Sequence, residues 1–487
     1  MSDKNREIKF DSLFNPKNVL IYEAKSKISF FIDGFLRQGY NIDNLFLISS
    51  TEDSIFGVNC YKNIDEIPIE SIDLVILSVK RDLLVERLQE LLDRKKVKFI
   101  HIFTAGTGES DDFGIRIEKN IKNVLDNYET TRAIGPNCMG IYCPKGKIAY
   151  YSSFPLESGN IGLIFQSGDL HSKMIKFGSR KYHLTFSKGV SIGNCVDIQI
   201  SEILQYFNHD EDIDLICVYI EGISTMYNDE GKKLFRILKT MRKPILFMRG
   251  GKTERAQTAV LTHTGSLSTK RRIWDAVYKQ TSIIEISSSL DELVDVTYLF
   301  YNYINRFKRL KKKIIFPSSK RTLVILWSGG FGILATDALT ELGLELPLFK
   351  DETLQKLKKI YPATIGSLTN PLDLPWIIHR DEFFELSKAA IDYNIDLVII
   401  ETDAWKDVES ERFKAYYNNL LKIKHYVEAS NKVFIIILHQ YPSESRKIFY
   451  DMLIKDNFIV YSTIDVAAKS FLKLYEYGKK ISKSNLN

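Results

Sequence analysis

One histidine of this chain stands where covalent chemistry is feasible. His263 lies in the segment Thr262-His263-Thr264-Gly265, on a loop rather than on an apolar face. Glu221 directly follows the apolar run Leu215–Ile220, where a carboxylate can hold one imidazole nitrogen while the other acts as a nucleophile. Most loop histidines are only solvated, and Glu221 taken alone equally suits a helix cap. We predict His263 and Glu221 as a catalytic pair.

Two glycine-containing turns follow apolar strands and precede helices. Gln166-Ser167-Gly168 comes after Ile161–Phe165, and Ser328-Gly329-Gly330-Phe331-Gly332 comes after Leu323–Leu326. Free backbone N–H groups at a helix N-terminus attract anions, and glycine lets the backbone approach closely. Either turn alone is equally consistent with plain turn chemistry. The predicted phosphate-binding residues are Gln166, Ser167, Gly168, Gly329, Gly330, Phe331 and Gly332.

Parallel sheets with crossover helices are needed to position these residues. The hydrophobic pattern of the sequence predicts such sheets. Short β-branched and apolar runs alternate with longer amphipathic segments, such as the helix expected over Leu83–Arg94, which is typical of an α/β fold. In such sheets ligands bind beyond the carboxyl ends of the strands, where the candidate residues stand. The predicted strands are Val19–Tyr22, Leu45–Ser49, Leu74–Val79, Phe99–Phe103, Ile161–Phe165, Leu215–Ile220, Ile245–Met248, Leu323–Leu326, Leu397–Ile400 and Val433–Leu438.

The strands fall into three series along the chain. Residues 1–150 read as a doubly wound, Rossmann-like domain, and a second series over 151–305 starts after the turn-rich stretch Glu157-Ser158-Gly159-Asn160. Basic residues crowd together in 306–320, a composition that favours a solvated linker. The third series occupies 321–487. We therefore expect three domains, as the length also suggests.

The composition excludes several classes of protein. The chain has 487 residues, 45% of them hydrophobic and 26% charged, unlike disordered, collagen-like or disulfide-rich chains. The net charge of +6 is spread thinly, so no nucleic-acid partner is predicted. No apolar run approaches the roughly 18 to 20 residues that span a membrane, and no export signal is visible. Five scattered cysteines without a Cys-x-x-Cys pair indicate reduced thiols, no metal site and a cytoplasmic location.

The motifs, taken in order, resemble one family. Four further segments join those at Gln166, Glu221, His263 and Gly329. Together the eight segments span nearly the whole chain. The chain resembles the NDP-forming acyl-CoA synthetases, which are relatives of succinyl-CoA ligase. The further matching segments are Ala105-Gly106-Thr107-Gly108-Glu109, Gly135-Pro136-Asn137-Cys138-Met139-Gly140, Ser191-Ile192-Gly193-Asn194 and Asn370-Pro371-Leu372-Asp373.

The resemblance implies a fold and a reaction. It implies a Rossmann-like CoA-binding domain followed by two flavodoxin-like domains of the succinyl-CoA ligase type. The implied activity is that of an α-type subunit, which interconverts acyl-CoA, phosphate and ADP with carboxylic acid, CoA and ATP through an acyl phosphate. His263 would carry the phosphoryl group and Glu221 would fix its ring. The helices that begin at the two glycine turns would converge on the phosphohistidine.

The resemblance also implies partners. The ATP-grasp domains of the family would lie on a separate β-type subunit, which would bind Mg²⁺ and ADP or ATP. Coenzyme A and a small carboxylic acid, or their acyl-CoA, would be the substrates, and a hetero-oligomer or a homodimer is expected. No motif specifies the acyl group or distinguishes ADP from GDP.

Two turns depart from the family pattern in the predicted CoA site. The first strand ends in Tyr22-Glu23-Ala24-Lys25-Ser26, where the family has a glycine-containing loop. Glu23 would repel a pyrophosphate unless it points away, and Lys25 and Lys27 would compensate. Val79-Lys80-Arg81 replaces a small Val-Pro-Ala type turn, and it either engages CoA phosphates or is a solvated basic turn. The predicted CoA-binding residues are Lys25, Ser26, Val79, Lys80 and Asn137.

Two other interpretations compete with the enzyme. A non-catalytic CoA-binding or regulatory paralogue would keep the architecture and lose normal CoA binding at Tyr22 to Ser26. The retained His263 and Glu221 argue against it. A dinucleotide-dependent oxidoreductase is disfavoured because no Gly-x-Gly-x-x-Gly opens the first helix.

Overall fold

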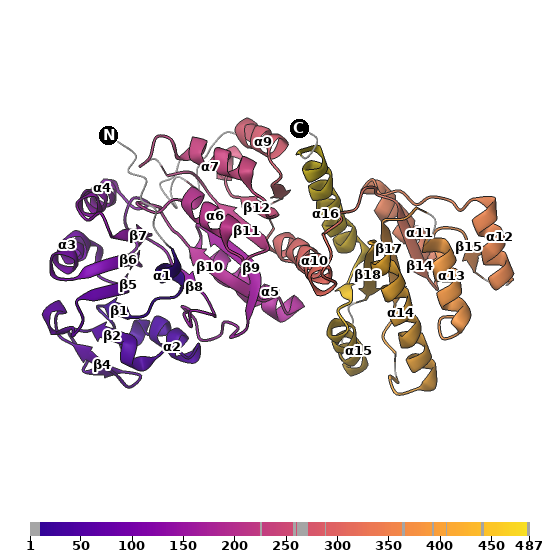
Figure 1. Cartoon of the computed structure of the whole chain (residues 1–487), viewed down its shortest axis with the longest axis horizontal. Helices are drawn as coiled ribbons and strands as arrows, with labels where there is room; N and C mark the ends of the chain where they lie inside the picture. Colours follow the sequence, from indigo (N-terminus) through magenta and orange to yellow (C-terminus); the bar gives the residue numbers. More distant parts are fainter. Residues whose placement is uncertain are drawn as a thin grey trace. The chain divides into compact units, whose positions relative to one another are not determined.

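A computed structural model describes most of the chain. The described residues are 10–224, 226–256, 260, 271–287, 289–362, 366–391, 394–405, 407–439 and 443–484, so His263 lies outside them. The chain divides into two compact units, Met1–Val294 and Asp295–Asn487. The described part is built on three β-sheets, two in the first unit and one in the second (Figure 1).

The first sheet has the strand order β3-β4-β2-β1-β5-β6-β7 and is parallel except for the β3–β4 pair. Its central strands β1 and β5 are buried except for Ser71 at the start of β5, as expected for a sheet with helices on both faces. The strands are β1 (Val19–Tyr22), β2 (Leu45–Ile48), β3 (Ser54–Ile55), β4 (Val58–Tyr61), β5 (Ser71–Leu77), β6 (Lys96–Ile102) and β7 (Arg132–Ile134). The helices are α1 (Asp11–Phe14), α2 (Phe30–Arg37), α3 (Leu84–Arg94) and α4 (Asp112–Asp126).

The second sheet of the first unit has the order β13-β12-β11-β9-β10-β8, with only β8 antiparallel among the described strands. The strands are β8 (Gly140–Tyr142), β9 (Ser158–Phe165), β10 (Phe186–Ser191), β11 (Leu215–Ile220), β12 (Ile245–Arg249) and β13 (Ile284–Ile286). The helices are α5 (Gly168–Tyr182), α6 (Ile200–His209), α7 (Glu230–Thr240) and α9 (Arg271–Gln280).

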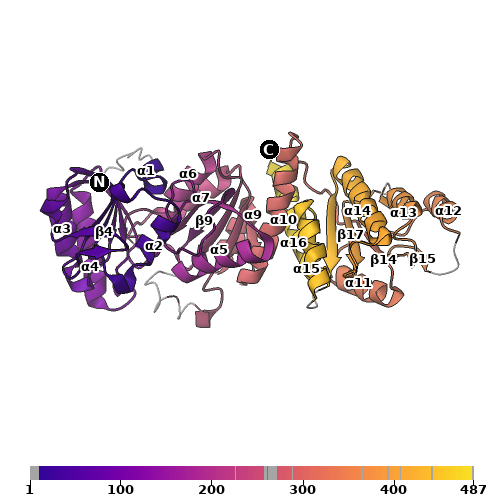
Figure 2. The same ribbon diagram turned by 90° about the horizontal axis from the view of Figure 1, so that it is seen from below.

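The sheet of the second unit has the order β15-β16-β14-β17-β18-β19. Figure 2 shows it nearly edge-on, with α16 and α14 on opposite sides. Its strands are β14 (Thr322–Leu326), β15 (Ser367–Leu368), β16 (Leu372–Asp373), β17 (Leu397–Thr402), β18 (Val433–Leu438) and β19 (Ile459–Tyr461). The helices are α10 (Leu290–Arg309), which contains the chain boundary between the units at Val294 and Asp295, α11 (Gly329–Glu341), α12 (Asp351–Ile360), α13 (Asp381–Ile391), α14 (Glu411–Ala429), α15 (Glu444–Lys455) and α16 (Ile464–Ser484).

Alternation along β14 separates the two helical layers of this unit. Leu323 and Ile325 belong to the hydrophobic cluster that α13 and α14 complete. Leu326 points to the opposite face, where a Cβ on Gly332 of α11 would lie 3.6 Å from its side chain. The period-2 pattern of a buried strand thus places α11 on the face away from α13 and α14.

The predicted α/β class is confirmed, and each predicted strand is present with ends shifted by a few residues. The longest strand that was not predicted is β10, whose Phe-Ser-Lys-Gly-Val-Ser sequence lacks an apolar run although every residue is buried. Short edge strands such as β7 and β8 were also not predicted. The domain boundaries at 150, 305 and 320 remain predictions. No helix of the described residues is long and apolar enough to cross a bilayer.

Replacement of Gly34 by Ala tests the packing of α2. An added Cβ would lie 2.1 Å from the backbone oxygen of Ala149, which cannot move aside as a flexible side chain would. We expect the free energy of unfolding to fall by about 1 to 3 kcal/mol, measured by urea denaturation. Gly231→Ala in α7 is the matched control, because its Cβ would find its nearest neighbour at 3.6 Å. The control should be neutral or stabilising by up to about 1 kcal/mol, and equal losses in both variants would contradict the packing argument.

Candidate active site

An open cleft of about 470 Å³ lies at the carboxyl ends of β1, β5 and β6. These strands are adjacent and parallel, so the turns that follow them meet at one edge of the sheet. Three of the predicted CoA-binding residues, Lys25, Val79 and Lys80, line this cleft together. The complete lining is Lys25, Ser78, Val79, Lys80, Arg81, Asp82, Phe103, Thr104 and Ala105.

The lining is electropositive. It carries three cationic side chains against the single carboxylate of Asp82. Arg81 is partly neutralised, because its Nη1 donates to Asp111 Oδ2 at 3.0 Å and to the carbonyl of Gly106 at 3.0 Å. Within the described residues, Lys25 and Lys80 make no ion pair or side-chain hydrogen bond. Their charge is therefore available to an anionic ligand such as a phosphate.

The loop after β1 reaches its conformation without glycine. Glu23 has a φ of 60°, in the left-handed region that a glycine would occupy at less cost. Its carboxylate accepts a hydrogen bond from Ser50 Oγ at 3.4 Å, and Glu23 does not belong to the lining of the cleft. The carboxylate of Glu23 is therefore turned toward Ser50 and away from the cleft. This reduces the repulsion that the sequence predicts between Glu23 and a bound pyrophosphate.

The other two predicted CoA-binding residues lie beside the cleft rather than in its lining. Ser26 is held by Glu52, which accepts from its backbone N–H at 2.7 Å and from its hydroxyl. These bonds lower the pKa of Glu52. The backbone N–H of Asn137 donates to the carbonyl of Thr104 at 2.9 Å, next to the wall of the cleft. Thr104 in turn donates its hydroxyl to the carbonyl of Val79 at 2.7 Å.

A buried polar network fixes the loop that follows β6. Glu109 accepts from the N–H of Gly106 at 2.6 Å, and Glu118 accepts from the N–H of Gly108 at 3.0 Å. Asn194, from the loop after β10, donates to both carboxylates at 2.7 Å. Burial raises the pKa of Glu118. Two of the segments matched to the family, 105–109 and 191–194, are therefore joined physically across the two sheets of the first unit.

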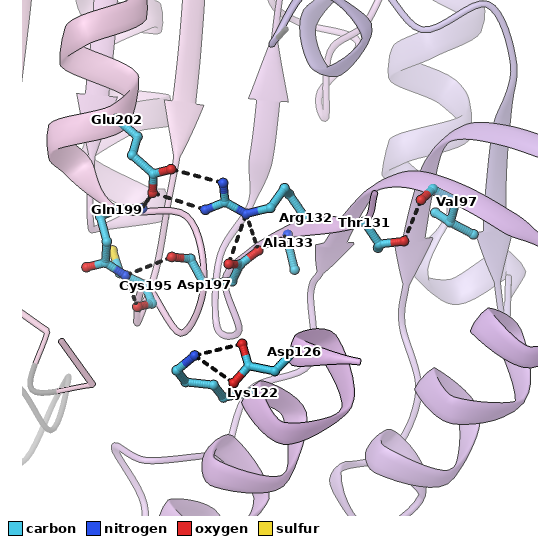
Figure 3. A network of polar contacts seen from close by, with 10 residues as sticks. All are labelled: Val97, Lys122, Asp126, Thr131, Arg132, Ala133, Cys195, Asp197, Gln199 and Glu202. Atoms are coloured by element: carbon cyan, nitrogen blue, oxygen red, sulfur yellow. Dashed lines mark hydrogen bonds and ion pairs between the residues drawn. The ribbon is translucent and has the colours of Figure 1, made fainter. Parts of the chain in front are cut away.

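A second link between these sheets is an arginine clamp (Figure 3). Arg132 of β7 donates from Nε to Asp197 at 2.9 and 3.0 Å and from Nη1 and Nη2 to Glu202 at 3.0 and 3.1 Å. Asp197 also accepts from the backbone N–H of Ala133 at 2.7 Å. Burial alone disfavours the charged guanidinium, but the two carboxylates hold the pKa of Arg132 above its ordinary value.

Glu221 lies at the carboxyl end of β11 and is buried. Tyr219 donates its hydroxyl to Glu221 Oε1 at 3.1 Å, and burial together with this carboxylate raises the pKa of the phenol. Gln166 fastens the turn: its Oε1 accepts from the N–H groups of Glu221 and Gly222, and its Nε2 donates to the carbonyl of Gly222 at 2.9 Å. The amide of Gln166 is thus committed to positioning Glu221.

Ser167 and Gly168 form the N-terminus of α5. Ser167 is the N-cap, and its hydroxyl accepts from the N–H of Leu170 at 3.3 Å. A Cβ on Gly168 would lie 2.4 Å from the side chain of Met139, so glycine is needed where the helix meets the segment 135–140. Gln166, Ser167, Gly168 and Glu221 therefore gather at the carboxyl ends of β9 and β11, which are paired.

In the second unit, Gly329, Gly330, Phe331 and Gly332 form the first turn of α11. Ser328 is the N-cap but its side chain makes no capping hydrogen bond. Asp373 lies alongside, 3.3 Å from the position of a Cβ on Gly329, and burial raises its pKa. The described residues contain no cluster of His, Cys, Asp and Glu that suits a metal ion.

Several residues that sequence reasoning did not select complete these sites. Arg81 and Thr104 were visible as residues that follow strands, but their contacts depend on the fold. Tyr219 lies within its strand, and nothing in the local sequence marks its bond to Glu221. Glu401 lies at the end of β17, and His439 directly follows β18. Ligands bind at the carboxyl ends of strands, and the search there that selected Glu221 would also have selected these two residues.

Comparison with known proteins assigns two parts of the chain to families. Residues 23–144 match the CoA-binding domain family, and residues 158–300 match the succinyl-CoA ligase like flavodoxin domain family. The chain is 28% identical over 395 residues to the acetate–CoA ligase (ADP-forming) II subunit alpha of Pyrococcus furiosus, covering 80% of this chain and 81% of that one. It is 32% identical to an ADP-forming acetate–CoA ligase of Methanocaldococcus jannaschii, covering 77% of this chain but only 50% of that longer protein.

A solved structure shares the fold. The dinucleotide forming acetyl-coenzyme A synthetase 1 of Ca. Korarchaeum cryptofilum, in complex with phosphate and ADP, superimposes with a TM-score of 0.77 at 22% identity. The match covers 98% of this chain and 99% of that one.

The two matched domains define a CoA-dependent acid–thiol ligase of the succinyl-CoA ligase type. Within that class the chain belongs to the NDP-forming acyl-CoA synthetases, as an α-type chain. The resemblance seen in the sequence is thereby confirmed, together with the Rossmann-like CoA-binding domain and the flavodoxin-like architecture.

Removal of Arg132 tests the clamp between the first two sheets. In Arg132→Met the buried Asp197 and the neighbouring Glu202 lose their shared cation, and we expect the free energy of unfolding to fall by about 3 to 5 kcal/mol in urea denaturation. The control is Asp126→Asn, which removes the exposed Lys122–Asp126 pair drawn in Figure 3. Its cost should stay below about 0.5 kcal/mol, and an Arg132 variant as mild as this control would refute the clamp.

Proposed function

We propose that the chain is the α-type subunit of an ADP-forming acyl-CoA synthetase. Phosphate attacks the thioester of an acyl-CoA, which releases CoA and forms an acyl phosphate. His263 then takes the phosphoryl group: an N–P bond forms, the O–P bond to the acyl group breaks, and the carboxylate leaves. Run in reverse, the same steps make acyl-CoA. The observation that carries the proposal is Glu221, buried at the end of β11 and oriented by Tyr219 and Gln166.

Glu221 is proposed as the residue that holds the ring of His263. A carboxylate stabilises the cationic imidazole that forms when a ring nitrogen is phosphorylated. Its own position is determined from both sides, since Gln166 binds the backbone of its turn and Tyr219 donates to its side chain. Such preorganisation is what a phosphoryl carrier requires, because the charge develops only during transfer.

The phosphoryl group is proposed to be bound by helix N-termini. Ser167 and Gly168 begin α5, and Gly329 to Gly332 begin α11. Each end supplies backbone N–H groups and a partial positive charge, worth about 0.3 to 2 kcal/mol per helix end. The side chain of Gln166, predicted as a phosphate ligand, is proposed instead to position Glu221, because its amide is already hydrogen-bonded.

Coenzyme A is proposed to bind in the cleft at the ends of β1, β5 and β6. Lys25 and Lys80 contribute charge for its phosphates, and Val79 contributes apolar wall. Ser26 and Asn137 support the two sides of the cleft through Glu52 and Thr104. The network of Glu109, Glu118 and Asn194 holds the loop that carries Ala105, a lining residue.

The remaining components are proposed from the family. A separate β-type subunit with ATP-grasp domains would bind Mg²⁺ and ADP or ATP and exchange the phosphoryl group with His263. A hetero-oligomer in the cytoplasm is the proposed assembly. The names of the relatives make acetate the first acid to test. The proposed domains are 1–150, 151–305 and 321–487, with a linker at 306–320.

Phosphoryl transfer to His263 can be measured without the partner subunit. Acetyl phosphate labelled in its phosphoryl group should transfer the label to the chain. The bound label should be acid-labile and base-stable, as a phosphoramidate is. His263→Asn should lose the label completely, because the nucleophile is absent. His209→Asn, an exposed histidine on α6, is the matched control and should keep it.

The same assay separates positioning from chemistry. Glu221→Gln should slow labelling on the order of 100-fold, because the neutral amide no longer stabilises the cationic ring. Unchanged melting behaviour of this variant would show that the loss is not unfolding. Full labelling of His263→Asn would refute the proposed carrier, and unchanged kinetics in Glu221→Gln would remove Glu221 from the mechanism.

The two lysines of the cleft test the CoA site. Lys25→Gln and Lys80→Gln should each raise the KM for acetyl-CoA roughly tenfold and leave kcat nearly unchanged, because a phosphate contact far from the thioester is lost equally in ground and transition states. Lys119→Gln, an exposed lysine on α4 outside the lining, is the control and should not change KM. The assay is CoA release in the presence of phosphate. If Lys25→Gln and Lys80→Gln had the same KM as the wild type and the control, CoA would bind elsewhere.

A further inference from the structure

Three neighbouring strands of the second unit end at one edge of its sheet. β14 pairs with β17 and β17 pairs with β18, all in parallel. β14 leads into α11, β17 ends with Glu401 and Thr402, and β18 is followed directly by His439. A helix N-terminus, a carboxylate and an imidazole are therefore brought to the same edge by the topology alone.

The carboxylate and the imidazole are in direct contact. His439 Nε2 lies 3.0 Å from Glu401 Oε1, and the ring of His439 packs edge-on against Phe331 in the first turn of α11, with centroids 4.9 Å apart. Arg446 of α15 fixes the backbone at this point, since its Nε donates to the carbonyl of His439 at 2.6 Å. The pair is thus held against the helix end.

The helix end itself is open. Ser328 makes no capping hydrogen bond, and Ser328, Gly329 and Gly330 are exposed. In α5 the equivalent serine, Ser167, does cap its helix. The first N–H groups of α11 therefore face solvent without the side-chain oxygen that usually satisfies one of them.

Negative charge surrounds this open helix end. Glu401 is 4% exposed, and its Oε2 has no hydrogen-bond partner in the described part of the second unit. Asp403 follows it on the same loop, and Asp373 lies beside Gly329. The other charged or titratable groups facing the pair are Tyr416 of α14 and Arg446, whose guanidinium is bonded to backbone carbonyls. Without a proton on the pair, an anion at α11 would be repelled by the charge of Glu401 as well as by that of the neighbouring aspartates.

We propose that Glu401 and His439 share a proton that cancels the negative charge of the buried carboxylate beside the N-terminus of α11, so that an anion binds at this helix end together with one proton from solvent. The anion is a phosphoryl or carboxylate oxyanion. The inference rests on the proposed phosphate-binding role of α11, and it adds the pair and its proton to that site.

The sign of the pH dependence follows from burial. Burial, reinforced by the charge of Asp403, raises the pKa of Glu401 to about 7. Above that pH the pair has lost its extra proton and carries a net negative charge, which repels an anion. Below it the pair is neutral as a whole, either as a carboxylate with an imidazolium or as a carboxylic acid with an imidazole. Anion binding should therefore weaken as the pH rises through neutrality.

The pair differs from histidines that are simply packed in the core. His101 and His171 of the first unit are fully buried, and neither has a carboxylate partner among the described residues. Burial lowers their pKa values to about 4 and about 3, so both remain neutral. The side chain of His439, in contrast, is 31% exposed and contacts the carboxylate of Glu401.

Histidine-selective NMR of the full chain tests the proposal. Sulfate is the probe, because its charge is constant between pH 6 and 9, unlike that of phosphate. The imidazole Cε1 signal of His439 is identified as the one missing in His439→Gln, and its titration midpoint, which belongs to the pair, is measured with and without sulfate. We expect saturating sulfate to raise this midpoint by at least 0.5 pH unit, and sulfate affinity to be roughly tenfold weaker at pH 8.5 than at pH 6.5.

The outcomes separate this inference from the proposed function. A signal that responds to sulfate at fixed pH, with an unchanged midpoint, would keep the anion site and overturn the shared proton. A signal that ignores sulfate at every pH would overturn the anion site of α11 as well, while the labelling of His263 is measured independently. A raised midpoint supports the proposal.

Two variants distinguish proton-linked anion binding from a purely structural role of the Glu401–His439 pair. Glu401→Gln keeps a hydrogen-bonding oxygen but removes the charge, so sulfate affinity should vary less than about threefold between pH 7 and 8.5. The wild-type pH dependence surviving in this variant would overturn the proposal. The exposed His425 on α14 is the internal control: its signal should not respond to sulfate, and His425→Gln should bind sulfate as the wild type does.

Discussion

Parallel strand pairing is the constraint on which every candidate site of this chain depends. A parallel sheet brings the carboxyl ends of its strands to one edge, and the crossover helices begin there with their N–H groups exposed. The chain uses this edge three times: at β1, β5 and β6, at β9 and β11, and at β14, β17 and β18. The chemistry differs because the residues that follow the strands differ, and the backbone arrangement is the same.

The two sheets of the first unit are fixed by buried polar contacts as well as by apolar packing. Arg132 joins β7 to the loop and helix after β10, and Asn194 from that same loop reaches Glu109 and Glu118. Such contacts contribute less to stability than to geometry, because desolvation offsets much of their energy. What they supply is a defined position for the loop at Ala105, and hence for one wall of the cleft.

Much of this arrangement could be predicted from the sequence. Leu215–Ile220 and Val433–Leu438 are continuous apolar runs, so both strands and the residues after them were identifiable. β10 was not, because its interior contains Ser187 and Lys188, and the buried lysine is paired with Asp210 at 2.6 Å and with Asp212 at 3.7 Å. The bond from Glu221 to Gln166 spans 55 residues of chain, so local sequence could place both residues but could not show that one holds the other.

The loop after β1 departs from the family pattern in a way that is compatible with the proposed CoA site. Glu23 in the left-handed region costs about 1 to 2 kcal/mol that a glycine would avoid, and the bond from Ala24 N–H to the carbonyl of Ile48 at 2.8 Å helps to hold that conformation. In return the chain places Lys25 in the lining of the cleft and turns Glu23 toward Ser50. A glycine loop would let the backbone approach a phosphate closely, whereas this loop offers the charge of the Lys25 side chain. Charge attracts a phosphate over a longer range but is screened by salt, so we expect the proposed binding in this cleft to depend more strongly on ionic strength than binding by a glycine loop does.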